Sequence, residues 1–352
     1  MPGAKIALLG SGESVLSAQT VGLTEFDSSG LSEVVIGADF EHRRLPGGGP
    51  RMNLLRCFLP HSVIDRGAYE PAVLVNGTFA SNAITIGTML QQNEATIVNR
   101  SKIRNATVQF YAEKAEMSYR AWPNATWLAF VITRERLLEF CVSHLGEMPR
   151  LPNSGITTFE PKFLESGYRF VERLRDLDRS LRSLGSIRNP SRLGESIEND
   201  LLGRIANLLC GKPLVQRKYD RHQLRFCDEI LRDTIKLVER DPTEMLDLRS
   251  MSKATGLNPR TLQRTFQAEY GLCPQEWLRV ERLNRVREDL LRAEPGNSVT
   301  DVATRWGFFH LGRFAQYYRE LFGERPSETA RRAVVVAPDG WQQTSPTLNR
   351  AA

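Results

Sequence analysis

The sequence has little of what disulfide frameworks, metal sites and membrane spans require. Its five cysteines are scattered and form no Cys-x-x-Cys pair, which excludes a zinc ribbon or a disulfide scaffold and fits a reducing cytoplasm. The five histidines share no short spacing, which argues against a metal-dependent enzyme. No apolar run reaches the roughly 18 residues of a membrane helix, and no Gly-x-Ser-x-Gly occurs. We expect a cytoplasmic protein that is not an enzyme and has no metal, cofactor or membrane contact.

The composition is that of a chain with sizeable cores and a mild basic excess. Its 352 residues suggest two or three domains, with 41% hydrophobic and 25% charged residues. The formal net charge is +6 and the pI is about 9.2. This balance permits an anionic partner without requiring one.

The first 150 residues are rich in short β-like runs. Val, Ile, Thr and aromatic residues dominate these runs, and Gly, Pro and Asn separate them, which predicts a sandwich or a small barrel. An aromatic group near Arg120 suggests a pocket for an anionic effector, although plain core is the simpler interpretation: Phe110, Tyr111, Tyr119, Trp122 and Trp127. The expected strands are 34–36, 52–59, 72–75, 83–89, 96–98, 107–111 and 127–132.

Residues 161–240 change to helical periodicity and predict a helical connector. Four leucines on its first helix are our candidates for a dimer seam: Leu174, Leu177, Leu181 and Leu184. Arginines on the same helix have the spacing to clasp a phosphate-bearing effector, but a solvated face paired with neighbouring acids is the favoured interpretation: Arg169, Arg173, Arg175, Arg179 and Arg182.

A pattern in residues 248–266 returns in residues 299–318. When Gly256 is laid on Gly307, the apolar positions of the two segments coincide, with one extra residue after the second glycine. Each copy is a short helix, a glycine turn and a second helix with an apolar face. Asn258 and Pro259 form a good helix start. This is the pattern of a helix-turn-helix unit, and residues 274–296 predict one long helix between the two copies.

Each second helix leaves polar side chains outside its apolar face. In the first copy these include Arg260, Gln263 and Arg264; in the second they include Arg313 and Gln316. Arginine reads guanine and glutamine reads adenine through paired hydrogen bonds. A helical pair with ordinary solvated side chains is the plainer alternative, but two copies in one compact region favour a DNA-binding domain.

Residues 246–332 resemble the DNA-binding domain of bacterial transcription regulators of the AraC/XylS type. The motifs that carry the resemblance are GLNPRTLQRTF, GLCPQEWLRVERLNRVREDLL and VTDVATRWGFFHLGRFAQYYRELFGERPSE, about a quarter of the chain. The resemblance implies a seven-helix domain whose two recognition helices enter successive major-groove segments on one face of the duplex. From Arg249 to Arg332, 15 Arg or Lys face 10 Asp or Glu, which agrees with binding to phosphates.

The resemblance assigns residues to each reading helix. The second unit departs from the family at 311–313 and 316, where the family usually has Ser-His before the core Phe and a basic residue two after it. We therefore expect it to read fewer bases or mainly to hold phosphate. The implied DNA-binding residues are Arg260, Thr261, Gln263, Arg264, His310, Leu311, Gly312, Arg313, Gln316, Tyr317 and Arg319.

The family commonly joins this domain to a sensing and dimerising domain, often a cupin-type β-barrel. The resemblance thus implies an α+β protein in four parts: a β-rich effector-sensing domain (1–150), a helical connector with a possible dimer contact (151–240), the DNA-binding domain (241–335) and a tail (336–352). Its implied partners are double-stranded promoter DNA, RNA polymerase, an unknown small-molecule effector and a second copy of the chain. The implied role is regulation of transcription, either as an activator or as a repressor. The alternative is an enzyme or sensor whose C-terminal helices bind a protein rather than DNA.

Overall fold

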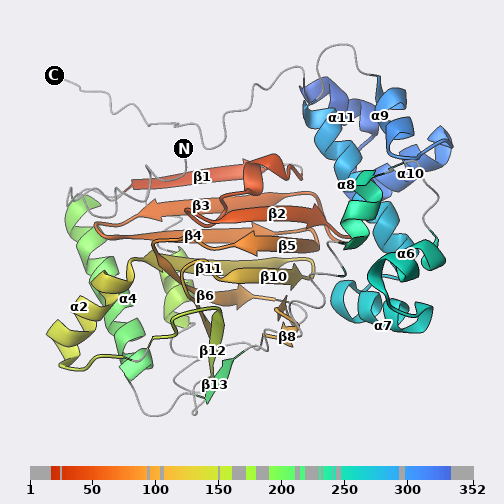
Figure 1. Ribbon diagram of the computed structural model, residues 1–352. Coiled ribbons are helices and arrows are strands. Elements are labelled where there is room, and N and C mark those ends of the chain that lie inside the picture. The colour runs from red at the N-terminus through yellow and green to blue at the C-terminus, as the bar shows by residue number, and fades with distance from the viewer. Residues whose placement is uncertain are drawn as a thin grey trace, which may run out of the picture.

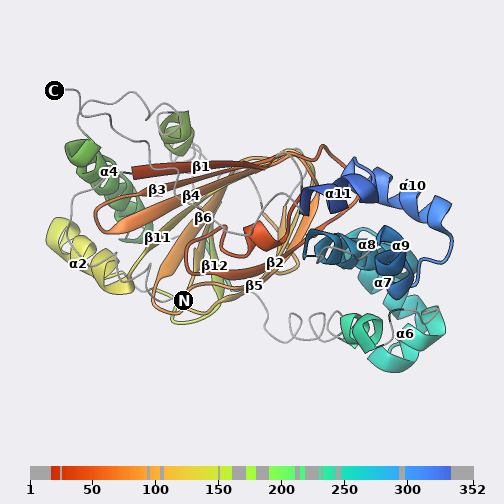
Figure 2. The ribbon, with the colours of Figure 1, turned by 90° about the horizontal axis from the view of Figure 1, so that it is seen from above.

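The protein has an α+β fold whose layers are visible from two sides (Figure 1, Figure 2). The computed structural model describes residues 17–23, 26–92, 96–103, 107–149, 151–160, 172–179, 190–210, 215–218, 230, 233–240, 242, 247–292 and 298–333. Two β-sheets lie at the centre. Helices α2 and α4 lie at one end of them, and helices α6 to α11 lie at the other (Figure 2).

All paired strands in both sheets are antiparallel, and the presence of the two sheets confirms the expected β-rich region. Sheet A has eight strands in the order β1 (Ser17–Leu23), β3 (Met52–Phe58), β4 (Ser62–Tyr69), β11 (Ala125–Ile132), β6 (Ile84–Gln91), β9 (Val108–Tyr111), β12 (Ile156–Glu160) and β13 (Val215–Lys218). Sheet B has five, in the order β2 (Asp39–Arg44), β5 (Val73–Thr78), β10 (Glu116–Ala121), β7 (Ile97–Val98) and β8 (Ser101–Lys102).

Every expected strand is present except 34–36. Those three side chains are buried, but their backbone forms turns and bends around Gly37, which has a φ of 71°. The Ile36 N–H donates to Asp65 Oδ2 at 2.7 Å instead of joining a sheet ladder. Strands β12 and β13 lie in the segment expected to be a helical connector and extend sheet A beyond residue 150.

The outer face of sheet A carries a second hydrophobic core. Helices α2 (Arg134–Leu145) and α4 (Pro190–Cys210) cover this face and pack apolar side chains against it. The buried members from the helices are Leu137, Phe140, Cys141, Leu201, Leu202, Ile205 and Ala206. None of the described helices has the length and apolarity that crossing a bilayer requires.

The connector leucines that the structure describes belong to this core. Residues 172–179 are helical, with Leu174 buried at 3% exposure and Leu177 packed against the same cluster. These two side chains are therefore not free for the predicted dimer seam, since they already contact their own chain. Leu181 and Leu184 lie outside the described residues.

The connector arginines follow the solvated-face interpretation where they are described. Arg175 pairs with Glu172, and Arg179 pairs with Asp176. Arg175 also donates from Nε and Nη2 to the Leu90 carbonyl, at 3.0 and 2.8 Å. These partners compete with the predicted phosphate clasp. Arg169 and Arg182 lie outside the described residues.

Sheet B separates the interior of the β domain from the C-terminal helices. Its inner face carries His42, which is 1% exposed, with Nε2 at 3.5 Å from the Tyr69 hydroxyl. Burial lowers the pKa of His42 to about 3, and the Phe40 backbone opposes that shift only in part. His42 is therefore neutral at pH 7, and no cation lies at this position of the interior.

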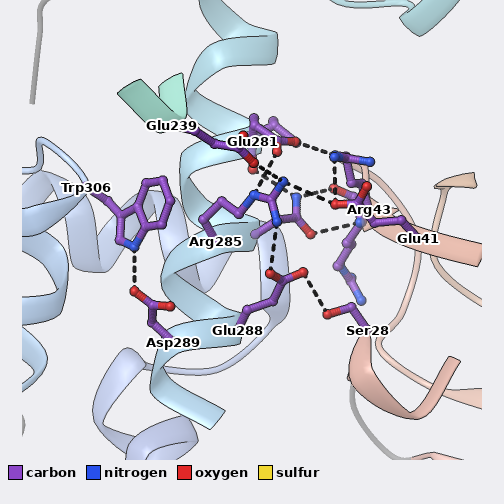
Figure 3. Close-up of polar contacts among 12 residues, drawn as sticks. Ser28, Glu41, Arg43, Glu239, Glu281, Arg285, Glu288, Asp289 and Trp306 are labelled. Carbon is purple, nitrogen blue, oxygen red and sulfur yellow. Dashed lines mark hydrogen bonds and ion pairs between the residues drawn. The ribbon is translucent and has the colours of Figure 1, made fainter. Parts of the chain in front are cut away.

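The outer face of sheet B docks on helix α8 (Pro274–Arg292) through buried polar groups (Figure 3). Arg43 Nε donates to Glu281 Oε2 at 2.5 Å, and these side chains are 4% and 1% exposed. The Asn284 amide accepts from Arg44 N at 2.9 Å and donates to Arg44 O at 3.1 Å. An ion pair and a two-point backbone contact thus fix one face of α8 on strand β2. We call these contacts the α8 clasp.

Further contacts surround the α8 clasp. Arg285 bridges Glu281 and Glu41 at 3.1 and 3.2 Å, and Ser28 Oγ donates to Glu288 at 3.1 Å (Figure 3). Near the far edge of sheet B, Arg100 pairs with Glu269 at 2.5 Å. The C-terminal helices are therefore held to the β domain at several points.

The first prediction concerns pH. The folded pKa of His42 lies below that of an unfolded histidine, so the unfolded chain binds more protons as pH falls below about 6.5. The stability contribution is complete above that pH and falls by about 1.4 kcal/mol per pH unit below it, until the folded pKa is reached. His42→Gln should remove this slope between pH 6.5 and 5, measured by urea denaturation. Equal slopes in variant and wild type would contradict the assignment.

The second prediction concerns the α8 clasp. Glu281→Leu or Arg43→Met alone should lower the free energy of unfolding by about 3 kcal/mol, because each leaves a buried charge short of a partner. The double variant should recover most of that loss, since it leaves no unpaired charge. Chemical denaturation of the full chain measures both. Asp200→Asn, which removes the exposed partner of Arg204 on α4, is the control and should cost less than about 1 kcal/mol. Additive single losses would contradict the pairing.

Candidate nucleic-acid interface

The first helix-turn-helix unit forms as its sequence predicts. Helix α6 (Leu248–Thr255) ends at Gly256, whose φ of 69° is the left-handed conformation that glycine adopts without strain. Helix α7 (Pro259–Tyr270) starts with Pro259 at its first turn, and the Asn258 side chain accepts from Thr261 N at 2.9 Å. These local signals fix the turn and therefore the direction in which α7 projects.

The second unit repeats the arrangement with different capping. Helix α9 (Val299–Arg305) begins at a capping box between Ser298 and Asp301, and Gly307 at φ 80° makes the turn. Helix α10 (Leu311–Phe322) follows. Helix α11 (Pro326–Ala333) closes the domain. The expected internal repeat is therefore present in the fold.

Helix α8 lies between the two units, as predicted, and supplies their shared core. Its buried apolar residues pack with α7 and α10 in one cluster: Trp277, Leu278, Val280, Leu283, Val286 and Leu290. Phe266 and Trp277 meet edge to face with ring centroids 5.4 Å apart. This packing fixes the separation of the two units because both rest on the same helix.

Arg287 ties α8 to the second unit. It is 2% exposed, and its Nη1 donates to Glu324 at 2.6 Å and to the Tyr318 hydroxyl at 3.3 Å. Its Nε donates to the Phe26 carbonyl of the β domain. The same guanidinium therefore contacts both the second helix-turn-helix unit and the β domain.

Helix α7 presents its predicted residues to solvent. Arg260, Gln263 and Arg264 are exposed, on the side opposite the buried Leu262 and Phe266. Thr261 is half-buried, and its backbone N–H is used by the helix cap. The exposed face of α7 is thus formed mainly by two arginines and a glutamine among the predicted residues.

Helix α10 also presents most of its predicted residues. Tyr317 is half-buried under Arg279, whose guanidinium lies 4.5 Å from the ring centroid, and Gln316 donates to Glu320 at 2.8 Å. Tyr317 is therefore less available than expected, and Glu320 places a negative charge beside Gln316. The exposed predicted residues are His310, Leu311, Gly312, Arg313, Gln316 and Arg319.

The start of α10 differs from the start of α7 in two ways. His310 at its N-cap makes no side-chain cap hydrogen bond, so the first-turn N–H groups face solvent without a protein acceptor at that cap. Phe309 and Leu311, which flank His310, are 62% and 41% exposed. Sequence reasoning included Leu311 and missed Phe309. Apolar side chains of this kind can meet the methyl group of thymine.

The arginines of both reading surfaces lack acidic partners within the described part of the chain. Arg260, Arg264, Arg313 and Arg319 form no ion pair with another described residue, whereas arginines elsewhere in the protein commonly do. Unpaired exposed guanidinium groups retain all their donors for a phosphate or a guanine. Within the described ranges, no three His, Cys, Asp or Glu side chains gather in a way that would hold a metal ion.

Sequence reasoning missed the polar face of α8. Glu281, Asn284 and Arg287 are buried at 1, 4 and 2% exposure and bind the β domain. Their spacing of three residues places them on one side of the helix. The signal was available as a polar row along a helix that already had a complete apolar stripe, but its partners lie some 240 residues earlier in the chain.

Comparison with known proteins agrees with this geometry. Residues 251–332 match the family described as a helix-turn-helix domain. The probable thc operon regulatory protein of Rhodococcus erythropolis is 39% identical over 103 residues, which cover 29% of this chain and 31% of that protein. The XylDLEGF operon transcriptional activator 3 of Pseudomonas putida is 35% identical over 101 residues, covering 28% of this chain and 30% of that protein. The chain thus spans about a third of the length of these relatives.

Solved structures give looser similarity. The alignment with the crystal structure of the AraC-like transcriptional activator CuxR covers 76% of this chain and 94% of the CuxR chain, with 11% identity and a TM-score of 0.40. A probable AraC family transcriptional regulator from Rhodopseudomonas palustris CGA009 covers 30% of this chain and 96% of its own, with 32% identity and a TM-score of 0.27. Residues 251–332 therefore carry a helix-turn-helix domain that is similar to the corresponding part of these operon regulators.

Proposed function

We propose that this protein is a sequence-specific transcription regulator that inserts α7 and α10 into successive major-groove segments of promoter DNA. The observation that carries the proposal is the pair of exposed reading surfaces with unpaired arginines, both mounted on α8. The relatives whose names describe operon regulators and activators support the same role. Such a protein acts in the cytoplasm, on double-stranded DNA.

The two units divide the work of recognition. We infer that α7 reads bases through Arg260, Gln263 and Arg264, because their side chains are exposed and have the donors that base edges require. We infer that α10 holds phosphate through Arg313 and Arg319 and through its uncapped first turn, as helix N-termini bind anions.

The wider assembly follows from the proposed role. We infer a homodimer, contact with RNA polymerase at activated promoters, and control by a small effector bound in the β domain. The division into sensing, connecting and DNA-binding parts at residues 150 and 240 remains a proposal, with β12 and β13 joining the sensing sheet. A protein-binding role for the C-terminal helices is the alternative that the exposed Phe309 and Leu311 favour.

The third prediction separates base reading from phosphate binding. Arg264→Ala should cost about 1–3 kcal/mol on the chain's own upstream DNA and little on random DNA, since a bidentate base contact carries sequence preference. Arg319→Ala should weaken both alike and lower the salt slope by about one. Fluorescence anisotropy of the full chain at several salt concentrations measures both effects.

A half-buried arginine far from the C-terminal helices serves as the control. Arg136 lies on α2, at the opposite end of the molecule from α7 and α10 (Figure 2). Arg136→Ala should leave affinity and salt slope unchanged. If wild type shows no preference for its own upstream DNA at low salt, the DNA-reading role is wrong and the protein-binding alternative takes its place.

A further inference from the structure

A cavity lies between the two sheets of the β domain. Residues from β2, β5, β7 and β10 of sheet B and from β4, β6, β9 and β11 of sheet A line it. The cavity has a volume of about 60 Å³, which is several times the roughly 10–15 Å³ that one water molecule needs. The space therefore suits a small ring compound better than a single water molecule.

The walls are apolar and carry no charge. Six aromatic side chains contribute to them, together with aliphatic residues: Phe40, Tyr69, Phe79, Tyr111, Tyr119 and Trp127. Among the described residues that line the cavity there is no Asp, Glu, Lys or Arg. An ion placed here would lose its hydration without gaining a counter-charge. The ligand that fits these walls is uncharged.

Two buried polar groups in the cavity are short of partners. Thr85 Oγ1 on sheet A, in a residue with 0% exposure, forms no hydrogen bond with any described residue, and His42 Nδ1 on sheet B, in a residue with 1% exposure, has only the Phe40 backbone beside it. The neighbouring Thr88 hydroxyl differs, because it donates to the Thr107 carbonyl at 2.9 Å. Unsatisfied buried polar groups are costly and uncommon in native proteins. A hydroxyl or carbonyl on the ligand would satisfy them.

Sheet B is the wall that the cavity shares with the DNA-binding domain. His42, Val75 and Tyr119 are paired across β2, β5 and β10, and all three line the cavity. The next row, Arg43, Leu74 and Arg120, points the other way because strand residues alternate between faces.

That second row meets the helices. Arg43 binds Glu281 of α8, and a Cβ at Gly271, after α7, would lie 3.5 Å from Arg120 Nη1. Arg120 is therefore directed at the DNA-binding domain and not into the cavity, which removes the basis for an anionic effector anchored by this arginine. A change in the cavity wall passes through a single layer of strands to α7 and α8.

We propose that the cavity between the sheets is the effector site of this protein and takes a small, uncharged, ring-sized molecule bearing one hydroxyl or carbonyl group that Thr85 and His42 bind. The statement that the ligand acts as an effector rests on the proposed function. Ligand binding in the cavity stands independently of it.

The experiment compares matched ligands on the full chain. Benzyl alcohol, toluene, benzoate and benzylammonium share one ring and differ in charge and in the hydroxyl. Calorimetry should show saturable binding of benzyl alcohol, binding of toluene several-fold weaker, and none of either ion at the same concentration. Equal binding of an ion, or no binding of either neutral compound, would overturn the proposal.

Two variants on the same strand locate the hydrogen bond. Thr85→Val keeps the shape and removes the unpaired hydroxyl, so it should bring benzyl alcohol and toluene within twofold of each other while leaving the melting temperature equal or higher. Thr88→Val, the control, should lower the melting temperature and keep the preference. Ala129→Leu fills the cavity and should abolish both. An unchanged preference in Thr85→Val would overturn the role of Thr85.

The regulatory part is tested on DNA with the same compounds. Benzyl alcohol should change the Kd for the upstream DNA at least threefold in wild type and not in Ala129→Leu. Binding of benzyl alcohol with no change in DNA affinity would overturn the effector assignment and leave DNA recognition intact. Absence of selective DNA binding would instead reject the proposed function, while calorimetry still decides the ligand class.

Discussion

The contact between strand β2 and helix α8 fixes how the C-terminal helices lie on the β domain. Arg43 and Glu281 form a buried ion pair. The side-chain amide of Asn284 accepts a hydrogen bond from Arg44 N and donates one to Arg44 O. Burying two charges is costly unless geometry and extra hydrogen bonds compensate for lost hydration. Glu41 and Arg285 supply those bonds. The contact holds α8 in one orientation on β2, because a shift of the helix along the strand would leave buried charges unpaired.

The helix-turn-helix units were predictable because their determinants are local. Gly256, Asn258 and Pro259 fix a turn within four residues, and a buried apolar face follows at helical spacing. The same reasoning identified six of the thirteen described strands: β3, β5, β6, β7, β9 and β11. It also placed the arginines of α7 and α10 outside, since a helix with one apolar face leaves only one side for them.

The strands that were missed show where local reasoning fails. Strand β2 reads DFEHRR, and β4 reads SVIDRGAY, so neither resembles a hydrophobic strand. Their charged residues are tolerated because Arg43 meets Glu281, and Asp65 meets Arg56 and the Ile36 amide. Glu281 lies 238 residues from Arg43 along the chain, so this pair has no local signature. The opposite error occurred at residues 34–36, which were predicted to be a strand and are not, since buried aliphatic residues need not form a strand.

The arrangement of sheet B has a thermodynamic consequence. One face of this sheet borders the cavity. The other face contacts the helices that carry both helix-turn-helix units, through ion pairs to α8 and α7. Coupling free energy between two binding sites is reciprocal. A ligand that tightens DNA binding through this wall must itself be held more tightly by the DNA-bound protein, by the same factor. The fraction of protein that holds the ligand would then rise with promoter occupancy.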